Sequence, residues 1–249
     1  LYDETMLLLE EAGIKLNRGK RILLLSAKGF PVEVLFLRDD DIPQSVANGV
    51  ADIGIVGENE YVEKGQEAKL IKRLGFSKCR LSLAIPKDED YQGVEWFAGK
   101  TIATSYPEIL KAYLAEKGVK ADLHVISGSV EIAPGIGLAD AIFDIVSSGS
   151  TLVSNQLKEV EVIMQSEALL IANNNLSDEK QAIRLILQQG QVHRLIYIIL
   201  VRSTTSTKLE TPYGILFAFS IALPFYRMII QITNIRLFNG FRLIIVWGK

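Results

Sequence analysis

Hydrophobic residues alternate along this chain between helical stripes and short continuous runs. Met6, Leu9 and Ala12 recur at the spacing of one helix face, which predicts an amphipathic helix over residues 5–12. Short apolar runs bounded by turn residues follow, and they predict strands at 21–26, 31–37, 51–57, 68–76 and 79–86. The first part of the chain is therefore predicted to alternate strands with short helices.

The same rhythm restarts after Pro86. The predicted elements are, in order, a strand at 99–105, a helix at 107–118, a strand at 121–129, a strand, loop and helix start at 140–152, and a long β-rich run at 158–173. Strands that alternate with helices at this pitch predict an α/β fold with largely parallel sheets.

Two such sets of elements predict two lobes. Lobe I is expected to hold residues 1–78 and to be completed by about 156–183, because the strands after Leu157 have no helices of their own. Lobe II is expected to hold residues 79–155. Two α/β lobes joined by crossing strands predict a two-lobed, type II periplasmic-binding-protein-like architecture with a cleft between the lobes. Since ligands bind at the carboxyl ends of strands in open α/β sheets, we expect the functional residues there.

The composition is that of an ordinary soluble globular protein. The chain has 249 residues, 49% hydrophobic and 22% charged, and its net charge of −2 gives no reason to expect a nucleic-acid partner. Cys79 is the single cysteine, so an internal disulfide is excluded and a reducing, cytoplasmic compartment is expected. Acidic residues among the first leucines argue against a signal peptide. Because the chain begins at Leu1 rather than Met, we expect its true start to be missing.

The last quarter of the chain has a different character. Residues 184–249 carry eight Lys or Arg against the single acid Glu210, a balance of +7, so the remainder carries −9. This tail is also strongly apolar. A membrane anchor at 213–226 is one interpretation, but 14 residues that include Pro224 are short for a span of about 20. We therefore expect no membrane partner.

The strongest chemical motif is FDIVSSGSTL, at residues 143–152. An apolar strand delivers Asp144 at its end, and a run of small residues leads into a predicted helix. Gly149 suits a positive φ angle, and successive backbone N–H groups can converge on a phosphate. The Ser148 and Thr151 hydroxyls can donate to phosphate oxygens, while Asp144 can accept hydrogen bonds from ribose hydroxyls. The pattern favours a ribose 5-phosphate site; the alternative is an ordinary strand–loop–helix turn with local caps.

The motif and its surroundings resemble the ATP phosphoribosyltransferases. The run Glu131–Leu152, EIAPGIGLADAIFDIVSSGSTL, fits that family's signature at every fixed position. Four upstream segments also look like the family; they lie at 38–43, 49–59, 79–84 and 102–107. The resemblance covers about residues 1–183, in the style of the long form of the enzyme, and all five segments agree in order and spacing.

The resemblance implies a phosphoribosyl transfer. Family members join N1 of the adenine of ATP to C1 of phosphoribosyl pyrophosphate and release pyrophosphate, which is the first step of histidine biosynthesis. Mg²⁺ is implied as the cofactor, held mainly by substrate phosphates rather than by a protein metal site. A homo-oligomer is implied as well. Two other classes stay open, namely a non-catalytic solute-binding module of the same fold and an inactive remnant of the enzyme.

The expected site residues follow from the resemblance together with the predicted elements. The phosphoribosyl pyrophosphate site is predicted to comprise Asp144, Ile145, Val146, Ser147, Ser148, Gly149, Ser150, Thr151 and Leu152. The residues predicted to bind ATP are Arg38, Asp52, Glu58, Arg80, Thr104 and Ser105. Glu131 is expected to orient the ribose or the loop, or else to be a cap or surface acid. Arg38 is expected to orient the nucleotide or to form a surface ion pair, and Asp52 to contact ATP or to cap a turn.

The tail departs from the family. Long-form enzymes continue with a small regulatory domain that binds histidine, whereas residues 184–249 show no such pattern. A shifted reading frame or a diverged end is the leading explanation, and feedback by histidine is expected to be absent from the chain as written. In the family a basic triplet precedes the residue that matches Leu1. Part of the ATP half of the site is therefore expected to lie before Leu1.

Overall fold

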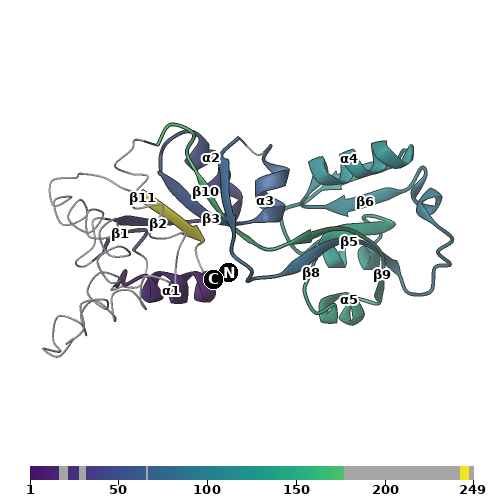
Figure 1. The fold of residues 1–249 in the computed structure, drawn as a ribbon. Helices are drawn as coiled ribbons and strands as arrows, with labels where there is room; N and C mark the ends of the chain where they lie inside the picture. Colours follow the sequence, from purple (N-terminus) through teal and green to yellow (C-terminus); the bar gives the residue numbers. More distant parts are fainter. Residues whose placement is uncertain (17–21, 28–31, 66, 177–241, 247–249) are drawn as a thin grey trace, which may run out of the picture. The chain divides into compact units, whose positions relative to one another are not determined.

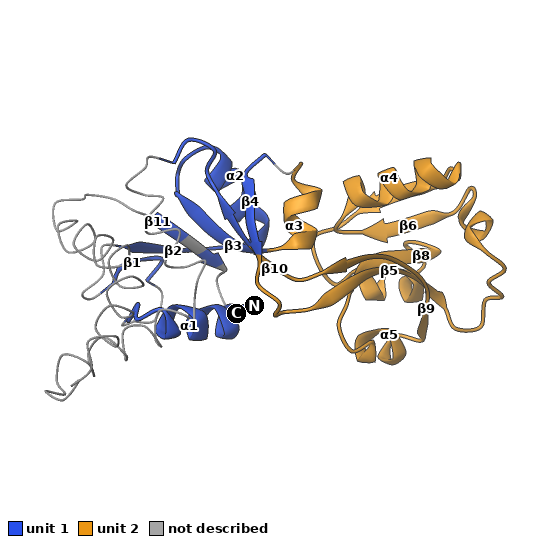
Figure 2. Ribbon diagram, in the orientation of Figure 1, with its two compact units in different colours: residues 1–56, 67–72, 170–249 blue, residues 57–66, 73–169 orange. Residues whose placement is uncertain are grey.

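The computed structural model of the chain describes residues 1–16, 22–27, 32–65, 67–176 and 242–246. The chain forms two compact units, which Figure 2 distinguishes by colour and which are described one at a time below. Unit 1 holds residues 1–56, 67–72 and 170–249, and unit 2 holds residues 57–66 and 73–169. The lobe boundaries expected from the sequence stay a prediction.

Unit 1 is built on a six-stranded sheet in the order β1-β2-β11-β3-β10-β4. Its strands are β1 (Leu24–Ser26), β2 (Glu33–Leu37), β3 (Ile53–Gly57), β4 (Lys69–Arg73), β10 (Ala168–Ala172) and β11 (Arg242–Val246). Its helical elements are α1 (Tyr2–Glu11), η1 (Asp39–Asp41) and α2 (Ile42–Ala47). Strands β3 and β10 are buried almost throughout, because IGIVG and ALLIA place apolar residues on both faces, as central strands require.

Strand β11 comes from the end of the chain and lies inside this sheet, between β2 and β3 (Figure 1). It runs parallel to both neighbours, and Leu243 pairs with Val34 on one side and Ile53 on the other. Leu243 and Ile245 are fully buried. A strand at this place was not among the predicted elements, although the aliphatic run RLIIV suits a buried parallel strand.

Unit 2 is built on a five-stranded sheet in the order β7-β6-β8-β5-β9. Its strands are β5 (Cys79–Pro86), β6 (Thr101–Thr104), β7 (Asp122–Val125), β8 (Ala141–Val146) and β9 (Leu157–Ser166). The sheet is mixed, since β6 is parallel to β7 and β8, whereas β5 is antiparallel to β8 and β9. The predicted α/β class, with two units that each have their own sheet as in the type II periplasmic-binding-protein-like architecture, is confirmed.

The two faces of the unit 2 sheet carry separate apolar clusters. Leu81, Leu83 and Phe143 belong to the cluster on one face, and Ile142 and Val146 belong to the cluster on the other. Alternate residues of a strand point to opposite faces. Asp144 therefore lies on the face of Ile142 and Val146.

Helical elements cover both faces of this sheet (Figure 1). The elements of unit 2 are α3 (Glu58–Glu63), η2 (Val94–Phe97), α4 (Pro107–Lys117), η3 (Val130–Ile132), η4 (Pro134–Ile136) and α5 (Ser150–Ser154). Helix α4 contributes to the Leu81 cluster, and η3 and α5 contribute to the cluster around Val146. The second face, with η3 and α5 above it, is the one that positions the candidate site.

Among the helices that the structure describes, none combines the length and the hydropathy needed to cross a membrane. Residues 213–226, at which an anchor was considered, lie outside the described part of the chain.

Candidate functional site

A pocket on unit 2 brings together most of the predicted phosphoribosyl residues. It has a volume of about 260 Å³ and is lined by Glu131, Ile142, residues 144–149, Thr151 and Leu152. Strand β8 carries Asp144, a turn follows at 147–149, and η3 supplies Glu131. Residues of the single segment Glu131–Leu152 thus meet at one end of β8, where a strand, a loop and a short helix join.

The turn after β8 presents several polar groups at one point. Gly149 has a φ of +79°, a conformation in which other residues are strained. Ser148 is exposed, and its Oγ lies 2.9 Å from Ser150 Oγ and accepts a hydrogen bond from the Ser150 N–H at 3.3 Å. Hydroxyls and backbone amides gathered on an accessible turn suit an anion.

Two carboxyl groups face this pocket. The pKa of Asp144 is raised to about 6, because burial disfavours its charge; a hydrogen bond from the Ile145 N–H opposes the rise, and the nearby charge of Glu131 adds to it. A pair of acids held this close favours ligands that donate hydrogen bonds or carry positive charge. Ribose hydroxyls and a cation bound to a phosphate are ligands of this kind.

Arg80, predicted to bind ATP, is engaged at the base of this loop. Its Nε and Nη2 atoms lie 2.6 and 2.7 Å from the two carboxylate oxygens of Glu159, and its Nη1 donates to the Ser147 carbonyl at 3.1 Å. Glu159 lies on β9 and was not among the predicted residues. Its partner is 79 positions away, so no local motif could have indicated the pair.

Thr104 and Ser105, also predicted to contact ATP, lie where β6 leads into α4. Thr104 is fully buried and its Oγ1 accepts a hydrogen bond from the Tyr106 N–H at 2.8 Å, while Ser105 Oγ donates to the Ile126 carbonyl at 2.7 Å. The N-terminus of α4 already has an acceptor, because the Glu63 carboxylate binds the N–H groups of the first turn. The predicted nucleotide contacts of Thr104 and Ser105 stay a prediction.

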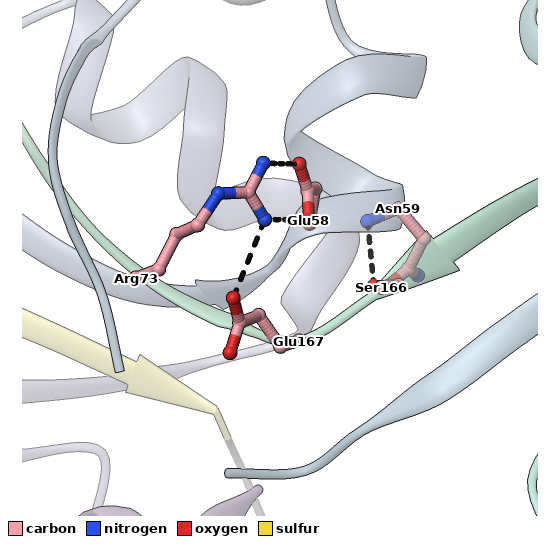
Figure 3. Close-up of polar contacts among 5 residues, drawn as sticks. All are labelled: Glu58, Asn59, Arg73, Ser166 and Glu167. Atoms are coloured by element: carbon pink, nitrogen blue, oxygen red, sulfur yellow. Dashed lines mark hydrogen bonds and ion pairs between the residues drawn. The ribbon is translucent and has the colours of Figure 1, made fainter. Parts of the chain in front are cut away.

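Glu58 begins α3 and forms a two-pronged ion pair with Arg73 at the end of β4 (Figure 3). Arg73 also lies 3.4 Å from Glu167, so one guanidinium joins two acids. Next to them the Asn59 N–H donates to Ser166 Oγ at 3.1 Å, and Ser166 Oγ donates to Asn59 Oδ1 at 2.9 Å. These contacts link α3, β4 and the β9–β10 turn; the role of Glu58 in binding ATP stays a prediction.

The polar contacts of Asn59 extend to Tyr106, a residue that was not predicted. Asn59 Nδ2 donates to the Tyr106 hydroxyl at 3.1 Å, and Tyr106 is almost fully buried. Burial and the neighbouring charge of Glu60 raise the pKa of this phenol, and the charge of Asp144 adds to the effect. The sequence shows a tyrosine shortly after a predicted strand. It does not show the partners of Tyr106, because these depend on tertiary packing.

Two of the predicted ATP ligands lie in unit 1. Arg38 is largely exposed, and its Nε lies 3.1 Å from Asp40 Oδ1. Asp52 precedes β3 and its Oδ2 accepts a hydrogen bond from the Arg242 N–H at 2.7 Å. Asp52 therefore contacts the first residue of β11 in this structure. Its role in binding ATP and its alternative role as a turn cap both stay predictions.

Two further chemistries find little support in the described residues. Burial raises the pKa of the Cys79 thiol, which disfavours the reactive thiolate. Among the described residues no group of three or more His, Cys, Asp or Glu side chains is arranged to hold a metal ion.

Comparisons by sequence give one family. Residues 38–191 match the family model described as HisG: ATP phosphoribosyltransferase. The ATP phosphoribosyltransferase of Parabacteroides distasonis is 90% identical over 180 residues, which are 72% of this chain and 64% of that protein. That of Phocaeicola vulgatus is 71% identical over 183 residues, 74% of this chain and 65% of that protein. The chain thus spans just under two thirds of the length of these curated relatives.

A solved structure is similar in both sequence and fold. A chain of the ATP phosphoribosyl transferase (HisG:HisZ) complex from Thermotoga maritima superposes with a TM-score of 0.65 and 28% sequence identity. The match covers 77% of this chain and 94% of that chain. The matched part of this chain therefore corresponds to nearly the whole of that solved chain.

Proposed function

Because this chain belongs to the ATP phosphoribosyltransferase family, we propose that it transfers the phosphoribosyl group of phosphoribosyl pyrophosphate to N1 of ATP. The products are phosphoribosyl-ATP and pyrophosphate, in the first step of L-histidine biosynthesis. The observation that carries the proposal is the pocket in which Asp144, Glu131 and the turn 147–149 converge.

The proposed reaction depends more on the positioning of the two substrates than on acid–base catalysis. A bond forms between adenine N1 and C1 of the ribose, while the bond from C1 to pyrophosphate breaks and the electron pair leaves with pyrophosphate. Adenine N1 has a free lone pair, so no side chain has to remove a proton from it. Positive charge develops at C1 and the ring oxygen, and oriented negative groups nearby stabilise it. Asp144 and Glu131 are the groups proposed to do so.

The turn 147–149 is proposed to bind the 5-phosphate. Gly149 lets the backbone come close to the ligand, and the exposed Ser148 hydroxyl can turn from Ser150 to a phosphate oxygen. Asp144 would accept hydrogen bonds from the ribose hydroxyls and so fix the sugar relative to the phosphate. Two anchors on one rigid group set the direction in which C1 faces the attacking base.

Mg²⁺ is proposed to enter with the pyrophosphate group. The pocket offers two acidic side chains, and burial of the Asp144 carboxylate, which raises its pKa to about 6, is a cost that a bound cation would offset. Mg²⁺ commonly binds through one or two carboxylates plus substrate phosphates, so Asp144 and Glu131 fit such an ion. When bound, the ion would neutralise the leaving pyrophosphate.

The ATP half of the site is proposed to involve Arg38, Asp52, Glu58, Thr104 and Ser105. Arg38 is 72% exposed, and its exposed pair with Asp40 contributes little stability, so the guanidinium could turn to a phosphate at small cost. The protein is further proposed to act as a homo-oligomer in the cytoplasm.

The proposal is tested by incubating the full-length protein with ATP, phosphoribosyl pyrophosphate and Mg²⁺ and following phosphoribosyl-ATP by absorbance. Product is expected to form, and its formation is expected to require all three additions. If no product forms although both substrates bind, the chain is a binding module or an inactive remnant, and the proposed activity is rejected.

A further inference from the structure

Arg80, Glu159 and Ser82 form a connected cluster at the base of the phosphoribosyl loop. Glu159 accepts two hydrogen bonds from Arg80, and the Ser82 hydroxyl donates to Glu159 Oε1 at 2.5 Å. The remaining Nη of Arg80 donates to the Ser147 carbonyl, the first residue after β8. One continuous set of hydrogen bonds therefore runs from β9 through β5 to the loop.

Strand register places this cluster beside Asp144. Across the antiparallel pair of β5 and β8, Ser82 lies opposite Asp144 and Arg80 lies opposite Val146. Residues directly opposite each other in such a pair point to the same face of the sheet. Arg80 and Ser82 therefore share a face with Asp144, and the cluster adjoins the pocket without lining it.

The ion pair within the cluster is well suited to hold a fixed geometry. Arg80 and Glu159 are 28% and 25% exposed, so both are partly buried. Hydrogen bonding from Arg80, with a smaller contribution from Ser82, lowers the pKa of the Glu159 carboxyl and keeps it ionised. A bidentate contact between guanidinium and carboxylate fixes the plane of the guanidinium as well as its distance.

The bond to Ser147 has a consequence for the next amide. In a planar trans peptide the C=O and the following N–H point in opposite directions. When Arg80 holds the Ser147 carbonyl, the Ser148 N–H is directed away from Arg80. Ser148 lines the pocket and is the residue whose amide would face a phosphate.

We propose that Glu159 is a positioning residue for the phosphoribosyl loop and that it acts through Arg80. Its carboxylate fixes the guanidinium, the guanidinium fixes the Ser147 carbonyl, and the peptide plane then presents the Ser148 N–H to the 5-phosphate. The inference rests on the proposed function, since phosphoribosyl pyrophosphate is the ligand that the loop would hold. It assigns Arg80 to the phosphoribosyl half of the site in place of the ATP contact expected from the sequence.

The test is a double-mutant cycle on the full-length protein, with Glu159→Gln, Arg80→Lys and the double variant. Each single variant is expected to raise the KM for phosphoribosyl pyrophosphate by about tenfold and to leave the KM for ATP within about twofold. Because both residues act through one chain of contacts, the KM for phosphoribosyl pyrophosphate in the double variant is expected to be no higher than in the worse single variant. Independent, additive losses, or a rise confined to the KM for ATP, would overturn the proposal.

A matched control lies two positions along the same strand. Glu161 accepts a hydrogen bond from the Tyr91 hydroxyl at 2.6 Å, and its partner across the β5–β9 pair is Leu83, which belongs to the cluster on the other face of the sheet from Asp144. Glu161→Gln makes the same chemical change on β9, so it is expected to leave both KM values unchanged. A rise in the KM for phosphoribosyl pyrophosphate equal to that of Glu159→Gln would point to a general effect on the strand and reject the specific role of Glu159.

A measurement without substrate separates this inference from the proposed function. Amide hydrogen exchange of the peptide that covers 145–152 is expected to be faster in Glu159→Gln than in the unaltered protein, and unchanged in Glu161→Gln. If the loop exchanges faster but the unaltered protein makes no product, the proposed function fails and the positioning role stands. If product forms and exchange in the loop is unchanged, only the positioning role fails.

Discussion

The carboxyl group of Asp144 lies partly buried beside Glu131, and both face the pocket. A charge held in such a place costs stability, since water solvates it better than the protein does. The same charge is what a ribose hydroxyl or a bound cation would use. At the scale of the residue, therefore, the buried charge of Asp144 lowers the free energy of unfolding and leaves a carboxylate available to a ligand in the pocket.

This cost predicts a dependence of stability on pH. The pKa of Asp144 is about 6 in the folded protein, against an ordinary value of 3.8, so the folded state holds its proton more tightly than the unfolded state. The contribution of Asp144 to the free energy of unfolding is therefore most favourable below about pH 4. It falls between about pH 4 and 6 and is least favourable above about pH 6. Asp144→Asn removes the charge and is expected to raise the free energy of unfolding at pH 7 by about 1 to 3 kcal/mol.

Urea unfolding at several pH values checks this expectation. The curves of the unaltered protein and of Asp144→Asn are expected to converge as the pH falls to about 4, because Asp144 is then protonated in the folded protein. A variant that is less stable at pH 7, or a difference that does not change between about pH 4 and 7, would contradict the account.

Helix α4 illustrates how an element can depend on a distant side chain. The helix has no side-chain cap of its own, and Pro107 at its start suits the first turn. Glu63 of α3 supplies the cap: its two oxygens accept the N–H groups of Glu108 and Ile109 at 2.9 and 3.0 Å. A carboxylate at this position also faces the positive end of the helix dipole.

Glu63→Ala is therefore expected to lower the free energy of unfolding by about 1 to 2 kcal/mol, because two amides lose their acceptor. Urea unfolding measures the loss, with Glu116→Ala as a control, since Glu116 is a largely exposed carboxylate on the same helix. The control is expected to change the free energy of unfolding by less than about 0.5 kcal/mol. Equal effects in the two variants would reject the capping role.

Local patterns predicted much of the unit 2 fold and most of the residues that line the pocket at the end of β8. The apolar alternation in β8, the small residues after it and Gly149 are contiguous, so their geometry follows from local rules. Glu131 was expected to be near the loop because it opens the same segment. Glu159 and Tyr106 were missed, because their partners at Arg80 and Asn59 come from other strands and helices. Pairings of that kind depend on register and packing, which a single sequence does not display.

At the scale of the whole chain, the pocket and its supporting contacts lie within one unit. Residues from Arg80 to Glu159 belong to unit 2, whereas two of the proposed ATP ligands, Arg38 and Asp52, belong to unit 1. The sheet of unit 1, by contrast, includes a strand from the far end of the chain, β11, which was not predicted. Binding of phosphoribosyl pyrophosphate can therefore be tested through residues of a single unit.

The most direct test compares the binding of the two substrates to the unaltered full-length protein and to Asp144→Ala by titration calorimetry. Phosphoribosyl pyrophosphate with Mg²⁺ is expected to bind the variant at least about tenfold more weakly, because the ribose hydroxyls lose their acceptor. ATP is expected to bind both proteins with nearly equal affinity. Equal losses for the two substrates, or no loss for phosphoribosyl pyrophosphate, would contradict the assignment of residues 144–152 to the phosphoribosyl half of the site.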